Sequence, residues 1–124
     1  MIKQFDEFVN ESTDRLSKEQ ECWRGMVLVT DNVRNIYAYV DKFAGDLVAR
    51  GEKDNKKLHD KLLKDNYYKQ ELKHILDLMK DHNNEQHKKY DSGDCDEFLE
   101  MSEKDQLYML AHRICDEVED YDVD

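Results

Sequence analysis

The chain contains no proline and only four glycines in 124 residues. These two residue types interrupt helices most strongly, whereas Lys, Glu and Leu, which are abundant here, favour them. No stretch of useful length alternates between apolar and polar residues, as a half-buried strand would. A chain of this length holds one hydrophobic core. The sequence therefore predicts an all-α protein in which residues 1–124 form a single-domain bundle of four to five helices.

The most regular helical pattern runs from Thr30 to Arg50. Its apolar residues are spaced by four and three positions, which places them on one face of a helix. Thr30 or Asp31 is suited to cap the first turn, and Gly51 can adopt the left-handed conformation that commonly follows a helix. The predicted core residues of this segment are Val29, Val33, Ile36, Val40, Phe43 and Leu47.

Four further segments have helical patterns. Residues 102–121 begin with a capping signal, Ser102 followed by Asp105. Residues 55–82 are predicted to kink or break near Asn66, because polar residues occupy two core positions there. The others are residues 3–23 and a short helix within residues 94–101, which follows a loop at residues 91–93. The predicted core residues are Phe5, Phe8, Val9, Leu16, Trp23, Leu58, Leu62, Leu72, Leu76, Met79, Leu107, Leu110, Ile114, Val118 and Tyr121.

Acidic residues are concentrated in the last third of the chain. The formal net charge of −11 divides into −2 for residues 1–51, +2 for residues 52–89 and −11 for residues 90–124. Direct nucleic-acid binding through a basic patch needs clustered Lys and Arg, so that class of protein is excluded. Carboxylates at the C-terminal end of a helix each cost roughly a few tenths of a kcal/mol against the helix dipole. Residues 90–124 are therefore an acidic region whose charge lowers the stability of the fold.

Two interpretations of this acidic region are open. It is a negative surface offered to a basic partner, or a solubilising tail without a partner. In the first interpretation the partner is a basic host protein that binds nucleic acid, and the chain itself contacts neither nucleic acid nor a membrane. The predicted partner-binding residues are Asp94, Asp96, Glu97, Glu100, Glu103, Asp116, Glu117, Glu119, Asp120 and Asp122.

The number of cysteines and the lengths of the apolar runs indicate the cellular compartment of the protein. Cys22, Cys95 and Cys115 are an odd number without a CxxC pair, which favours a reducing environment and a packing role. The longest apolar run, Met26 to Val29, has four residues, whereas a bilayer span needs roughly 18–20. The N-terminus is polar from Lys3 onward, unlike a signal peptide. The sequence therefore predicts a cytoplasmic protein.

Few residues have the spacing of a catalytic or metal-binding motif. Glu71 and His74 form one ExxH, but a helical di-metal site needs two copies. His112 lies beside an apolar stripe, which indicates packing rather than catalysis. His59 and the remaining histidines lack partners at ligand spacing. The sequence predicts a non-enzymatic protein with no catalytic residue, no metal and no cofactor.

One pair of acidic motifs resembles the signature of all-α nucleotide pyrophosphohydrolases. Glu97 and Glu100 form an ExxE, and Glu117 and Asp120 form an ExxD after sixteen intervening residues. The resemblance implies carboxylates on two facing helices that bind magnesium, which in turn holds a triphosphate. The chain departs from that family by ending four residues after Asp120. A magnesium-dependent enzyme of this kind is an alternative prediction.

The N-terminal residues resemble the capsid-targeting leader of internal head proteins in T-even-type phages. That leader has the form Lys-x-aromatic-x-Glu-Phe-aliphatic-x-Glu-small and is cleaved after its last Glu. The matching residues are Lys3, Phe5, Glu7, Phe8, Val9, Glu11 and Ser12. The resemblance implies a phage protein, in the host cytoplasm or the virion, that blunts a host defence nuclease. Phage proteins that imitate DNA are similarly small, helical and acidic.

A second short resemblance lies at residues 28–36. Here Leu28, Thr30, Arg34 and Asn35 are similar to the L-T-T-S-x-I-R-N-L helix start in the small helical subunit of type III-A CRISPR effector complexes. The resemblance implies that Arg34 and nearby lysines contact the RNA backbone. The chain lacks that family's Tyr-x-Ala-Gly-Arg segment, and its net charge is unusual for a subunit that lines guide RNA.

Overall fold

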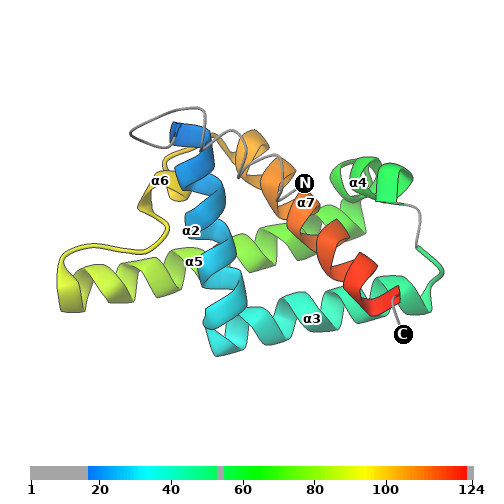
Figure 1. Ribbon diagram of the computed structural model, residues 1–124, viewed down its shortest axis with the longest axis horizontal. Helices are drawn as coiled ribbons and strands as arrows, with labels where there is room; N and C mark the ends of the chain where they lie inside the picture. Colours follow the sequence, from blue (N-terminus) through cyan, green and yellow to red (C-terminus); the bar gives the residue numbers. More distant parts are fainter. Residues whose placement is uncertain (1–16, 53–54, 123–124) are drawn as a thin grey trace.

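The computed structural model describes residues 17–52 and 55–122, which form six helices and no strand. Figure 1 shows them in chain order as α2 (Lys18–Asn32), α3 (Arg34–Ala49), α4 (Asn55–Lys64), α5 (Asn66–Tyr90), α6 (Asp96–Leu99) and α7 (Glu103–Asp122). The all-α prediction is confirmed. The described part holds six helices rather than four to five, because the segment after residue 55 divides into α4 and α5. The residues that resemble the phage leader lie outside the described part.

The helix α7 is the element against which most of the others pack. It contacts α2, α3, α4 and α5, and in Figure 1 it runs diagonally from the neighbourhood of α6 toward the end of α3. The helix α2 packs against α3 and α6. Buried apolar side chains from all six helices form one cluster. None of the described helices is long and apolar enough to cross a membrane.

The predicted apolar stripes supply this core. Every predicted core residue in α4, α5 and α7 is buried except Tyr121, which is 37% exposed. In the α2–α3 segment Val33 is only partly buried, as is Trp23. All three cysteines are buried in the core and none of them forms a disulfide, which confirms their predicted packing role.

The helix predicted from Thr30 to Arg50 begins later than expected. Val33 has an extended conformation and separates α2 from α3, so Thr30 and Asp31 belong to the last turn of α2. The Thr30 hydroxyl donates to the Met26 carbonyl at 2.9 Å within α2, and it therefore does not cap α3. The prediction at the other end is confirmed, because Gly51 follows α3 with a φ of 83°.

The break predicted near Asn66 occurs at Asp65. This residue has an extended backbone, and its carboxylate accepts hydrogen bonds from the amides of Tyr67 and Tyr68 at 2.9 and 3.2 Å. An aspartate in this position satisfies amides that would otherwise lack partners at the start of a helix. The chain therefore leaves α4 and begins α5 in a new direction.

Candidate acidic interface

The ten predicted partner-binding residues fall into two groups. Five lie in α6, in the loops beside it and at the first residue of α7, whereas the other five lie in the last turns of α7. The two groups are at opposite ends of α7 (Figure 1). A helix of 20 residues spans about 30 Å. The acidic region therefore contains two separate sites rather than one surface.

In the first group, Asp96 is turned inward to fasten α6 to α5. Its carboxylate accepts hydrogen bonds from Asn83 Nδ2 and His87 Nε2, both at 2.7 Å, and from the Gly93 amide at 3.1 Å. The hydrogen bonds from Asn83 and His87 lower the pKa of Asp96. This carboxylate holds the fold together and is already satisfied within the molecule.

Hydrogen bonds to Gln86 on α5 fix the loop that precedes α6. The Asp94 amide donates to Gln86 Oε1 at 2.9 Å, and Gln86 Nε2 donates to the Asp94 carboxylate at 2.7 Å. A Cβ at Gly93 would lie 1.9 Å from Asn83 Oδ1, so only glycine fits there. The other acidic residues of this group, Glu97, Glu100 and Glu103, are exposed, and Glu103 lies 3.8 Å from Lys73 Nζ.

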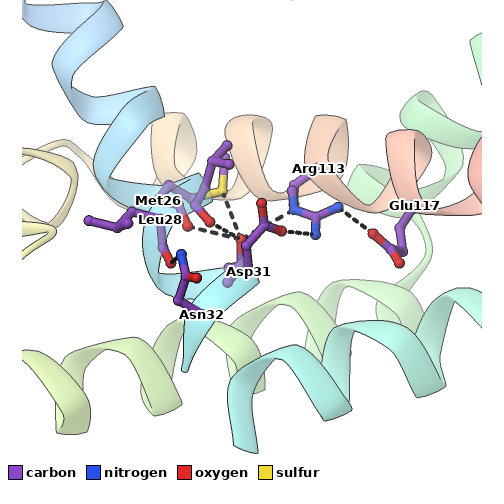
Figure 2. A network of polar contacts seen from close by, with 8 residues as sticks. Met26, Leu28, Asp31, Asn32, Arg113 and Glu117 are labelled. Carbon is purple, nitrogen blue, oxygen red and sulfur yellow. Dashed lines mark hydrogen bonds and ion pairs between the residues drawn. The ribbon is translucent and has the colours of Figure 1, made fainter. Parts of the chain in front are cut away.

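In the second group, Glu117 is buried in an ion-pair network around Arg113 (Figure 2). Arg113 Nη1 donates to Glu117 Oε1 at 2.7 Å, and Nη2 donates to Asp31 Oδ1 at 2.5 Å. Arg113 Nε also donates to the Thr30 hydroxyl at 3.2 Å. The arginine is 6% exposed and Glu117 is 8% exposed. Glu117 therefore binds within the molecule and is not available to a partner.

Two exposed tyrosines lie beside this network. The carboxylates of Glu117 and Asp41 raise the pKa of Tyr37. A hydrogen bond to the Asp41 carboxylate raises the pKa of Tyr121. Asp41 and Tyr37 belong to α3, whereas Glu117 and Tyr121 belong to α7. Negative charge from α3 and α7 therefore gathers around both phenol groups, next to Asp31 at the end of α2.

We call the surface at this end of the molecule the acidic α3–α7 face. No basic residue lies in the last turn of α7. Asp116 is half-buried, which raises its pKa, so it is left out of the face. The side chain of Asp122 lies outside the described part. The face consists of Asp31, Tyr37, Asp41 and Tyr121, together with Glu119 and Asp120, which are exposed in the same last turns of α7.

The ten predicted residues did not include Asp31 or Asp41. Both lie in the first part of the chain, where positive and negative charges are nearly balanced. The net charge of that segment therefore does not indicate them. The only signal in the sequence is the position of Asp41 on the polar side of the α3 stripe. Their place beside the end of α7 follows from helix packing.

The carboxylate pairs that resemble the pyrophosphohydrolase signature do not meet. Glu97 lies on α6 and Glu100 directly follows it, whereas Glu117 and Asp120 lie near the far end of α7. Glu117 is also committed to Arg113. Within the described residues there is no group of three or more His, Cys, Asp or Glu side chains that could hold a metal ion.

The residues that resemble a CRISPR small subunit are divided between two helices. Arg34 and Asn35 are exposed at the start of α3, and Leu28 is 46% exposed on α2. Thr30 is buried and bonded to Met26, so it cannot contact RNA.

Comparisons of the whole chain with protein-family models, curated proteins and solved structures find no match. The function is therefore argued from the geometry alone.

Proposed function

We propose that this protein is a non-enzymatic binding protein that offers its acidic α3–α7 face to a basic partner. The observation that supports this most directly is that Asp31, Glu119 and Asp120 are exposed at the same end of the molecule as the exposed tyrosines Tyr37 and Tyr121. Like charges held together on a surface repel one another and disfavour the compact state. A positively charged partner relieves this repulsion, so its binding to the face is favourable in free energy.

The tyrosines favour a protein as that partner. Tyr37 and Tyr121 are 40% and 37% exposed. Tyrosine is enriched in protein interfaces, because its ring contributes a large contact area at a low cost in side-chain entropy. Arginines of a partner can pair with the carboxylates and lie against the rings. A surface rich in arginine is typical of proteins that contact nucleic-acid phosphates.

The proposed mode of action is competition with DNA. The exposed Glu97 and Glu100 form a second acidic group, roughly the length of α7 from the acidic α3–α7 face. A groove that binds duplex DNA is basic along its length, since the duplex carries one negative charge per roughly 1.7 Å. Two separated acidic groups suit such a groove better than a single point of charge. A phage protein that occupies the DNA groove of a host defence protein in the host cytoplasm would act in this way.

The test is a binding experiment with two matched charge-reversal variants. Glu119→Lys/Asp120→Lys changes the acidic α3–α7 face, whereas Asp77→Lys/Glu85→Lys makes the same change in net charge at exposed positions of α5. Wild-type protein should capture a basic host protein at low salt and release it at high salt or on addition of duplex DNA, because salt screens surface charge pairs. The first variant should lose at least about tenfold in affinity, which equals 1.4 kcal/mol.

The α5 variant is the control, and it should bind as wild type does. Glu117 is left unchanged because a lysine there would face Arg113 in a buried network. Equal binding by wild type and both variants would contradict the proposal. So would capture that duplex DNA does not reverse, because the partner would then be bound outside its DNA groove.

A further inference from the structure

The contact between α4 and α7 includes a cluster of rings, two of which are histidines. The ring centroids of His59 on α4 and His112 on α7 are 4.4 Å apart. The Tyr108 ring lies 4.7 Å from His59 and 5.3 Å from His112. Trp23 on α2 approaches His112 edge-on at 6.4 Å. Four rings from three helices therefore pack at one place.

The helix α4 is a short element whose backbone is interrupted on both sides. It has ten residues, and buried Leu58 and Leu62 anchor it in the core. Gly51, with its left-handed backbone, lies before α4, and the extended Asp65 follows it. Both ends of α4 are therefore already interrupted. Its release does not require α3 or α5 to unwind.

The histidine pair tolerates the neutral state better than the charged state. His59 Nε2 lies 3.3 Å from the Tyr108 carbonyl oxygen, which can only accept, so Nε2 carries the proton of a neutral ring. The next proton makes the ring a cation. Two imidazolium rings at this separation repel each other. Burial, and then the charge of His59, lower the pKa of His112.

The charged neighbours of the pair are of both signs. On α4, Lys56 and Asp60 line the same shallow groove as His59, and Asp60 lies 3.0 Å from Lys64 Nζ. On α7, Asp116 follows His112 by one turn, and burial and Glu119 raise the pKa of Asp116. The α2 side of the cluster is the Trp23 ring. In the described part of the chain, neither histidine of the pair lies in an ion pair with a carboxylate.

A third histidine has a different environment. His87 Nε2 lies 2.7 Å from the Asp96 carboxylate, on the contact between α5 and α6. That contact therefore places a carboxylate beside an imidazole, whereas the contact between α4 and α7 places two imidazoles side by side.

We infer that the contact between His59 and His112 is pH-sensitive: it holds α4 against α7 while the His112 ring is neutral and releases α4 when that ring takes up a proton. This device is independent of the proposed function. Because the folded-state pKa of His112 lies below its ordinary value of 6.5, docking of α4 is strongest above pH 6.5 and weakens as the pH falls below it. One such group changes the docking equilibrium by at most about tenfold per pH unit.

The test is amide hydrogen exchange followed by NMR at pH values above and below 6.5, corrected for the intrinsic exchange rate. In wild type, protection at Leu58 and Leu62 should fall on acidification, while protection in α6 should not. The variant His59→Phe/His112→Phe keeps rings in the contact without titratable groups, so the fall should disappear. His74→Phe is the matched control, because His74 also stacks on a tyrosine, Tyr39, at 4.5 Å. It should keep the wild-type response.

Two results would overturn the inference. One is protection of α4 that does not change with pH in wild type. The other is an equal fall in wild type and in the phenylalanine variant. If that variant does not fold, NMR titration of His112 in wild type replaces it. A midpoint at or above that of the unfolded chain would then contradict the inference, whereas a lower midpoint would support it.

Discussion

At the scale of single residues, Arg113 is the centre of the buried ion-pair network that holds α7 against α2. Its guanidinium joins α7 to the end of α2 through Asp31 and Thr30, and it neutralises the buried Glu117. A buried ion pair often adds little stability over apolar residues of similar volume, but removal of one partner leaves a charge buried without compensation. The sequence spacing of Arg113 and Glu117, four positions on one helix, allows this pair, but the contact with Asp31 depends on the fold.

The first prediction concerns this network. Arg113→Ala should lower the free energy of unfolding by about 3–5 kcal/mol, because Glu117 is left buried and unpaired. Urea unfolding measures this loss. In the double variant Arg113→Met/Glu117→Leu, which replaces both partners by apolar residues, the loss should be much smaller. A loss below about 1 kcal/mol in Arg113→Ala would show that the pair is not buried in solution.

At the scale of the elements, the two shortest helices depend on their neighbours. A four-residue helix such as α6 is far below the length at which an isolated helix is stable. It is held by the buried Phe98 and by the hydrogen bonds that Asp96 accepts from α5. The helix α4 is held by Leu58, Leu62 and the rings around His59 and His112. Both helices therefore depend on apolar and polar contacts together, since Lys61 of α4 also forms an ion pair with Glu52.

Replacement of Asp96 by asparagine tests the attachment of α6. At pH 7, Asp96→Asn should lower the free energy of unfolding by about 1–3 kcal/mol, because hydrogen bonds to a charged acceptor are lost. The folded-state pKa of Asp96 lies below its ordinary value of 3.8. The ionised carboxylate therefore stabilises the fold above pH 3.8, and this contribution is lost as the pH falls through the lowered folded value.

Urea unfolding at a series of pH values measures the difference between wild type and Asp96→Asn. The difference should shrink as the pH falls below about 4. Asp77→Asn, at an exposed position of α5, serves as the control and should change stability by less than about 0.5 kcal/mol at any pH. A difference between wild type and Asp96→Asn that is constant with pH would contradict this account.

At the scale of the whole molecule, the distribution of charge lowers the stability of the fold. The last third of the chain carries the full net charge of −11, and the last turn of α7 has no basic residue to complement the helix dipole. Part of this charge is neutralised internally, through Arg113 and through the partners of Asp96. Other carboxylates of this part of the chain, among them Glu97, Glu100, Glu119 and Asp120, are exposed near the two ends of α7. Natural proteins commonly keep such destabilising features where function requires them.

Charge reversal at the acidic α3–α7 face should therefore stabilise the protein. Glu119→Lys/Asp120→Lys should raise the free energy of unfolding by about 1 kcal/mol at low salt, because each charge that opposes the helix dipole costs about 0.3–1 kcal/mol. The gain should shrink at high salt, where surface charges are screened. Thermal unfolding at two salt concentrations measures both effects. A variant less stable than wild type at low salt would show that these carboxylates make stabilising contacts.

The sequence by itself determined the secondary structure and most of the core. Helical spacing and the lack of proline predicted the helices, and the polar residues at 65 and 69 predicted the break before α5. These signals are local, since side chains three and four positions apart share a helix face wherever that helix packs. The boundary at Val33 was missed, because the Thr30 hydroxyl bonds back to Met26 in a way that is indistinguishable in sequence from a cap.

Only the tertiary structure decided which carboxylates form a candidate site. The sequence predicted ten, but packing buries Glu117 against Arg113 and turns Asp96 toward Asn83 and His87. It also adds Asp31 and Asp41, which are more than 70 positions from the end of α7 in the chain. A pattern along the chain fixes which side of a helix is polar. It does not fix which polar residues of different helices meet, because that depends on how the helices cross.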